Sequence, residues 1–107
     1  MEFKHHTALK RAEKIKAGEF TARQLSEGLL PYIESSNRVL NTLVVAADGT
    51  MLSDAEAVDQ RIAKNEDLLL AGVHLVVKDD FWIRGLPTGL GSAAFKKFMP
   101  PSNAAAV

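Results

Sequence analysis

Apolar positions in the first part of the chain recur at helical spacing. A first helix is predicted between Thr7, a good N-cap residue, and Gly18, which suits a helix end. It places Leu9, Ala12 and Ile15 on one face. This face is the first candidate for a buried surface.

The next segment carries a stronger helix signal. Residues 21–24 read TARQ, a capping box in which Thr21 caps the helix and Gln24 reaches back. Pro31 interrupts the pattern, and an interior proline costs roughly 3 kcal/mol, so a kink or two shorter helices are predicted. The apolar stripe of this segment consists of Leu25, Leu29, Tyr32 and Ile33.

Two further helices are predicted. One starts after Thr50 or Ser53 and ends in the charged residues 64–67. A short last helix lies within residues 91–98, with Ser92 as its cap. The apolar side of the longer helix consists of Leu52, Ala55, Val58 and Ile62.

Two valine-rich runs are predicted to be strands. The first covers residues 40–48, and the second, residues 72–77, continues after a bend through residues 81–85. Helices and strands in this order predict an α/β fold, with helices packed on a small mixed sheet centred on Val73–Val77. Because two or three strands are too few for such a sheet, residues 1–107 are interpreted as a single partial domain.

The composition mainly excludes certain partners and kinds of site. The 107 residues carry 13 basic and 13 acidic side chains, which gives no global field to attract nucleic acid, and none is expected as a partner. Without cysteine there are no disulfides, thiolate nucleophiles or Cys-based zinc sites. The longest apolar run, residues 68–77, is about half the ~20 residues of a membrane helix. No membrane association and a cytoplasmic location are expected.

Most candidate sites have a simpler structural explanation. His5 and His6 are adjacent and lack a third ligand, so no metal is expected. Gly85, Gly89 and Gly91 do not form a dinucleotide fingerprint. Basic residues near the N-terminus read as a solvated helix side.

Lys78 is the exception, because it ends an apolar run and is followed by two acids and a glycine-rich turn. A lone lysine at such a place commonly extends to water from a strand end. Its surroundings change that interpretation. The blocks GVHLVVKDD, RGLPTGLGS and PPSNAAAV, in this order, resemble the N-terminal part of the amidase-signature family. Upstream blocks, including the Ala55–Asp59 spacing, are similar too, so the resemblance runs from about Leu9 to Val107.

The resemblance implies an amide-bond hydrolase. Its members use a serine nucleophile and a second serine, at a cis peptide bond, that links the nucleophile to a lysine. The matching lysine is Lys78, as general base, and burial would favour the neutral form that a base needs. The implied substrate of the complete parent enzyme is a small carboxamide, and no cofactor is expected.

The sequence also departs from the family pattern. The two serines lie further along the family's chain, and Ser92 and Ser102 are not their counterparts, so this chain is expected to be inactive alone. His74 replaces a usual proline. Asp80 replaces a usual asparagine and would share a strand face with Lys78, whereas Asp79 would point away and hold the backbone.

Two other hypotheses stand beside the free-amidase fragment. One is a fragment of the A subunit of glutamyl-tRNA(Gln) amidotransferase, although the LPTGLGS and PPSNA blocks lean toward the free amidases. The other is a non-catalytic interaction module from a degenerate amidase gene, which binds through an exposed sheet edge. The expected protein partner is a second copy of the chain or a complementary C-terminal part.

Overall fold

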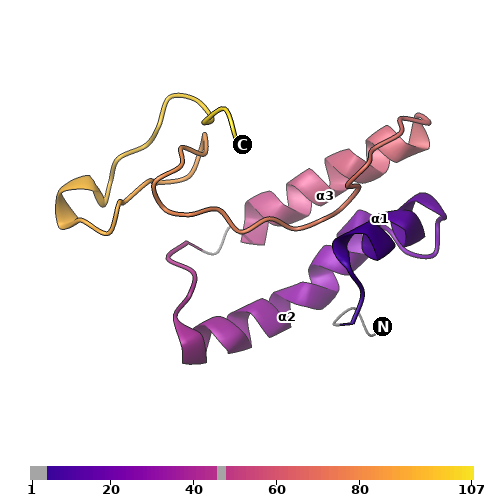
Figure 1. Cartoon of the computed structure of the whole chain (residues 1–107), viewed down its shortest axis with the longest axis horizontal. Coiled ribbons are helices and arrows are strands. Elements are labelled where there is room, and N and C mark those ends of the chain that lie inside the picture. Colours follow the sequence, from indigo (N-terminus) through magenta and orange to yellow (C-terminus); the bar gives the residue numbers. More distant parts are fainter. Residues whose placement is uncertain (1–4, 46–47) are drawn as a thin grey trace. The chain divides into compact units, whose positions relative to one another are not determined.

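The computed structural model describes residues 5–45 and 48–107, which form two compact units (Figure 1). The helical unit consists of the described residues up to Thr42 together with Asp48–His74. The loop unit consists of residues 43–45 and Leu75–Val107. The expectation of one partial domain over residues 1–107 stays a prediction.

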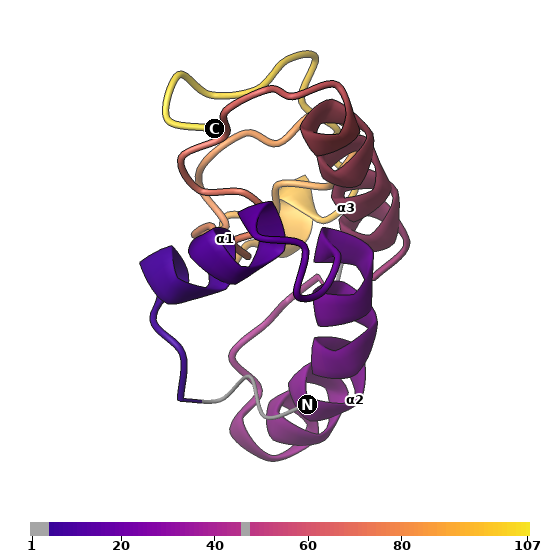
Figure 2. The same ribbon diagram turned by 90° about the vertical axis from the view of Figure 1, so that its right-hand side faces the viewer.

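Helix α1, Ala8–Lys16, forms where the sequence predicts it. The Thr7 hydroxyl accepts a hydrogen bond from the Lys10 backbone N–H at 3.2 Å and so satisfies one of the free amides at the helix start. Ala12 and Ile15 are buried, as their spacing indicates, while Leu9 stays exposed. Figure 2 shows how the turn after α1 leads directly to the start of α2.

Helix α2, Ala22–Leu40, begins with the predicted capping box. The Gln24 N–H donates to the Thr21 hydroxyl at 3.0 Å, and the Thr21 N–H donates to the Gln24 side-chain oxygen at 2.9 Å. The helix runs unbroken through Pro31, so the expectation of two shorter pieces is wrong. A capped start and the complete burial of Leu25 outweigh one missing backbone donor.

Helix α3, Asp48–Ala63, starts a little earlier than predicted and packs against α2. Ala55 is buried at this contact, and Val58 and Ile62 pack against the same core. Many core residues are small, so the helix backbones can approach closely. The core of the helical unit consists of Ala12, Ile15, Phe20, Ala22, Leu25, Ala55 and Ala71.

The predicted α/β fold is wrong for the described residues, which contain helices and turns but no β-strand. Of the runs expected as strands, residues 41–45, 72–77 and 81–85 lie outside the helices. Leu40 is the last residue of α2, residue 48 is the first of α3, and residues 46 and 47 lie outside the described residues. A strand needs a second extended segment to pair its N–H and C=O groups. The apolar run Val73–Val77 has no such partner among the described residues and lies between two turns. The Val73 N–H closes the first turn on Leu70 O at 3.1 Å.

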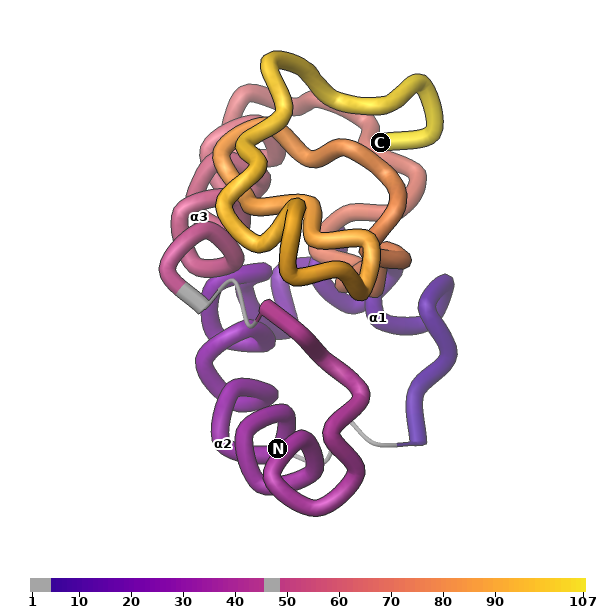
Figure 3. The backbone as a smooth tube through the Cα atoms, turned by 90° about the vertical axis from the view of Figure 1, so that its left-hand side faces the viewer, coloured from indigo at the N-terminus to yellow at the C-terminus, as the bar shows by residue number. Residues whose placement is uncertain are grey.

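Figure 3 traces the winding backbone of Leu75–Val107, coloured from orange to yellow. Backbone hydrogen bonds between its turns hold the loop unit together. The Thr88 N–H donates to Phe98 O at 3.0 Å, and the Ala104 N–H donates to Trp82 O at 2.8 Å. The Phe98 ring lies 5.8 Å from that of Trp82. The predicted last helix is only one 3₁₀ turn, η1, Ala93–Phe95, although Ser92 caps it as expected.

Among residues 5–45 and 48–107, no helix is both long enough and apolar enough to cross a membrane.

Candidate functional site

Lys78 lies on a turn of the loop unit, with 80% of its side chain exposed. The expectation that it is buried is therefore wrong in this structure. Its Nζ lies 3.7 Å from Oδ2 of Asp80. Strand alternation predicted that these two side chains lie together, but a turn brings them together, closed by the Phe81 N–H on Lys78 O at 3.1 Å.

A shallow hollow of about 170 Å³ adjoins Lys78 within the loop unit. Lys78 is the charged residue among its otherwise apolar lining. The hollow is lined by Leu75, Val76, Val77, Lys78, Phe81, Ala106 and Val107.

Asp79 holds the backbone, as predicted. Its Oδ1 accepts a hydrogen bond from the Gly89 N–H at 2.9 Å, and its carbonyl oxygen accepts one from the Leu90 N–H at 3.1 Å. The segment that carries Lys78 is thereby attached to the glycine-rich turn at two adjacent amides.

No serine among the residues that the structure describes forms a hydrogen bond with Lys78. The hydroxyls of Ser35 and Ser53 donate to carbonyl oxygens of their own helices. The Ser92 hydroxyl accepts the Ala94 N–H as the cap of η1. The described residues thus contain the proposed base but no nucleophile bonded to it.

His74 and Ser26 form a polar pair in the helical unit that no sequence pattern indicated. Nε2 of His74 lies 2.9 Å from the Ser26 hydroxyl, which itself donates to Ala22 O at 2.9 Å. The hydroxyl must then accept from a protonated Nε2, which leaves Nδ1 as the bare nitrogen. That Nδ1 is buried without a hydrogen-bond partner in the described part of the chain. Burial, and secondly the positive charge of Arg11, lower the pKa of His74.

This histidine predicts a pH dependence of stability. Because the folded pKa lies below the usual 6.5, the unfolded chain binds protons first as the pH falls. The contribution of His74 is complete above 6.5 and is lost as the pH falls from there through the folded pKa. Urea midpoints at about pH 7.5 and about pH 5 should differ less in His74→Gln, which keeps an N–H toward Ser26 but does not titrate. An equal difference in both proteins would contradict this role.

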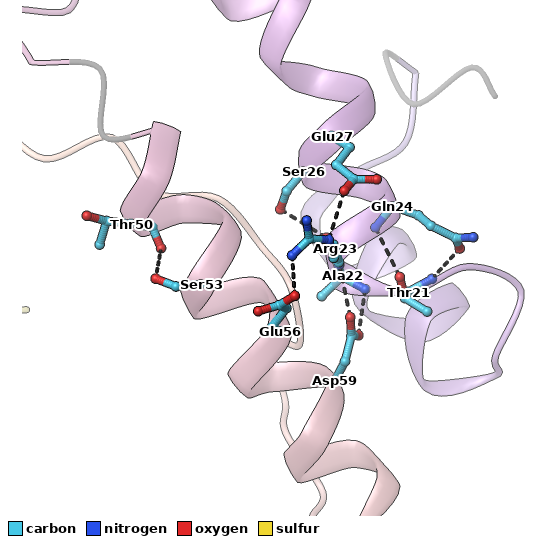
Figure 4. A network of polar contacts seen from close by, with 10 residues as sticks. All are labelled: Thr21, Ala22, Arg23, Gln24, Ser26, Glu27, Thr50, Ser53, Glu56 and Asp59. Carbon is cyan, nitrogen blue, oxygen red and sulfur yellow. Dashed lines mark hydrogen bonds and ion pairs between the residues drawn. The ribbon is translucent and has the colours of Figure 1, made fainter.

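Asp59 joins α3 to the start of α2 (Figure 4). Its two carboxylate oxygens accept the Ala22 N–H at 2.7 Å and the Arg23 N–H at 3.0 Å. A carboxylate at a helix N-terminus also interacts favourably with the helix dipole. Next to it, the Arg23 guanidinium pairs with Glu27 at 2.8 Å and with Glu56. The Ala55–Asp59 spacing noted in the sequence therefore has a structural role, remote from Lys78 in the chain.

The described segments contain no group of three His, Cys, Asp or Glu side chains that could hold a metal ion.

Comparison with known proteins identifies related sequences over most of the chain. Residues 24–107 match the family model described as Amidase. The A subunit of the glutamyl-tRNA(Gln) amidotransferase of Alkalilimnicola ehrlichii is 38% identical over 96 residues, which are 90% of this chain and 20% of that protein. The corresponding A subunit from Streptomyces coelicolor is 37% identical over 99 residues, 92% of this chain and 20% of that protein. The chain thus spans about a fifth of the length of these relatives.

A solved structure has a similar arrangement of the backbone. It is described as "An unexpected vestigial protein complex reveals the evolutionary origins of an s-triazine catabolic enzyme". The TM-score is 0.84 with 29% sequence identity, over 92% of this chain and 22% of that one. An inhibitor-bound form of the same complex matches equally well, with a TM-score of 0.84.

Proposed function

Because the chain belongs to the amidase family, we propose that Lys78 is the general base of an amide-hydrolysing site in a protein of amidase length. The observation that carries this proposal is the position of Lys78, at the rim of an apolar hollow and on a backbone segment held by Asp79. The implied substrate is a small carboxamide, and the reaction needs no metal or organic cofactor.

The proposed chemistry needs two serine hydroxyls that Lys78 does not contact in the described residues. One hydroxyl attacks the amide carbon while its proton passes through the second serine to the neutral Nζ of Lys78. The C–N bond then breaks, and the protonated Lys78 returns a proton to the leaving amine. Water attacks the acyl-serine by the same route and releases the carboxylic acid.

Exposure of Lys78 is the main obstacle to this role in the chain as described. The Lys78 side chain is 80% exposed and its Nζ lies 3.7 Å from the Asp80 carboxylate, whereas a general base has to be held next to the group from which it takes a proton. The proposal therefore requires further residues to cover the hollow and exclude water. Its apolar lining, Leu75 and Val76 above all, is 75% and 76% exposed and suits such a cover.

The first test is ammonia release from simple primary carboxamides such as propionamide and benzamide. A protein of amidase length that contains these 107 residues is expected to release ammonia, whereas the 107-residue chain alone is expected to be inactive. The missing nucleophile and oxyanion-stabilising groups are commonly the largest catalytic terms. Turnover by the repurified 107-residue chain that Lys78→Ala abolishes would contradict the expectation that the chain alone is inactive.

A second candidate function follows from the names of the relatives. Both relatives named above are A subunits of glutamyl-tRNA(Gln) amidotransferases, at 38% and 37% identity. In that case Lys78 would have the same role, but the released ammonia would be transferred in a reaction that depends on glutamyl-tRNA(Gln). Carboxamide hydrolysis without that tRNA favours the free amidase, and dependence on the tRNA favours the amidotransferase.

The non-catalytic alternative loses the surface on which it was based. It required an exposed sheet edge, and the described residues contain no strand to provide one.

A further inference from the structure

We propose that Asp79 is the positioning residue that fixes the backbone on which Lys78 stands. This inference rests on the proposed function of Lys78 and adds a second residue to the same site. Asp79 does not contact the reacting atoms in this proposal. It acts through the polypeptide chain, by attaching the turn at Lys78 to the glycine-rich turn at Gly89 and Leu90.

The two hydrogen bonds of Asp79 are arranged to limit rotation of the segment. The carbonyl oxygen of Asp79 accepts the Leu90 N–H at 3.1 Å, and its side-chain Oδ1 accepts the Gly89 N–H at 2.9 Å. A single bond would leave the turn free to swivel about it. A second bond from the same residue to the adjacent amide removes that freedom, and bonds to an ionised carboxylate are stronger than neutral ones.

Gly89 has no side chain at the point where the carboxylate approaches. A Cβ there would lie 3.1 Å from Oδ2 of Asp79, closer than ordinary van der Waals contact. The glycine therefore permits the close approach that the hydrogen bond to its N–H requires. Asp79 is partly buried, and its carboxylate bonds to the backbone of the glycine-rich turn.

The neighbouring Asp80 provides a matched control. It has the same side chain one position later, but it pairs with Lys78 Nζ at 3.7 Å and its side chain is 45% exposed. Loss of the Asp80 carboxylate removes a charge near the amine without detaching the turn. Loss of the Asp79 carboxylate removes one of the two hydrogen bonds that hold the turn and leaves the charge partner of Lys78 in place.

The test measures carboxamide hydrolysis by the amidase-length protein with single substitutions. Asp79→Ala should lower kcat about 10- to 100-fold with KM nearly unchanged, because a small displacement of a catalytic group is costly. Asp79→Asn, whose amide oxygen can still accept the Gly89 N–H, should recover part of the rate. Gly89→Ala should lower kcat similarly, and combining it with Asp79→Ala should add little, since both disturb one contact.

The outcomes separate this inference from the proposed function. If Lys78→Ala is inactive while Asp79→Ala keeps the wild-type kcat, the positioning role is wrong and the proposed function stands. If Lys78→Ala is fully active, the proposed function is wrong. Amide hydrogen exchange in the 107-residue chain checks the attachment without any activity: Asp79→Ala should accelerate exchange at Gly89 and Leu90, and Asp80→Ala should not. Unchanged exchange in Asp79→Ala would overturn the inference.

Discussion

Substituting Gly72 by alanine is expected to destabilise the helical unit severely, although it adds only one methyl group. The new Cβ would lie 2.5 Å from Ile15 Cδ1 and 2.9 Å from Ala22 Cβ. Ile15 is 3% exposed and Ala22 fully buried, so neither can move aside freely. Ala22 is also the first residue of α2, and its N–H is held by Asp59. The φ of Gly72, +66°, adds strain for any residue with a side chain.

The expected cost is about 2–5 kcal/mol, from the left-handed backbone and overpacking together. Small domains have a total stability of about 5–15 kcal/mol, so this loss is a substantial share of the total. Urea unfolding followed by circular dichroism measures the loss.

Gly18→Ala is the matched control for this substitution. Gly18 belongs to the same unit and has a φ of +75°, but a Cβ there meets nothing within 4 Å. It should therefore show the backbone cost of about 1–2 kcal/mol alone. Ile15→Val removes the Cδ1 atom and should recover part of the stability lost in Gly72→Ala. A Gly72→Ala protein as stable as Gly18→Ala would show that the close contacts at Gly72 are not rigid.

Replacing Lys78 by alanine is expected to reduce carboxamide hydrolysis by the amidase-length protein about 10²–10⁴-fold, the usual range for a general base. KM should change little, because Lys78 is assigned to proton transfer and not to substrate binding. Lys78→Arg should be equally inactive, since a guanidinium keeps its proton at all ordinary pH values. Stability of the 107-residue chain should be unaffected, because the Lys78 side chain is 80% exposed in it.

Asp80→Asn is the control for the charge environment of Lys78. It removes the carboxylate 3.7 Å from Nζ and leaves the amine in place. Activity should survive in this variant. Initial rates of the four proteins over a range of substrate concentrations give kcat and KM, and a Lys78→Arg enzyme with wild-type kcat would exclude proton transfer by this side chain.

The helices of this chain could be predicted because their signals are local. The Thr7 cap and the Thr21–Gln24 box lie within one turn of the groups that they satisfy. Burial of Ala12 and Ile15 followed from their spacing in the same way. The start of α3 was less accurate, and the sequence placed it after Thr50 or Ser53 although the helix begins at Asp48.

The strands were predicted wrongly because a strand is not a local structure. The run Val73–Val77 is apolar and rich in β-branched residues, and such a pattern indicates a segment that tends to be buried. Forming a strand also requires a second segment at the right distance, which the residue pattern does not specify. The described residues contain no such segment beside it.

The candidate site was predictable only in part for the same reason. Lys78 and Asp80 are close because they are neighbours on one turn. The pairing of Ser26 with His74 joins positions 48 residues apart, and nothing in either local sequence indicates the other. The hollow beside Lys78 likewise needs Ala106 and Val107 from the far end of the loop unit. The family blocks around Lys78, rather than periodicity, indicate it as a site residue.

Chemical rescue of the Lys78→Ala enzyme tests the central claim most directly, because it asks whether a free amine can replace the missing one. The measurement is carboxamide hydrolysis by this amidase-length variant with increasing concentrations of a small alkylamine such as ethylamine. If Lys78 is the general base, the rate should rise in proportion to the concentration of neutral amine, and the Lys78→Arg enzyme, whose site is filled, should respond much less. The account would be contradicted if the Lys78→Ala enzyme stays inactive at every amine concentration while the Lys78→Arg enzyme is active. That result would show that this position needs a positive charge and not a base.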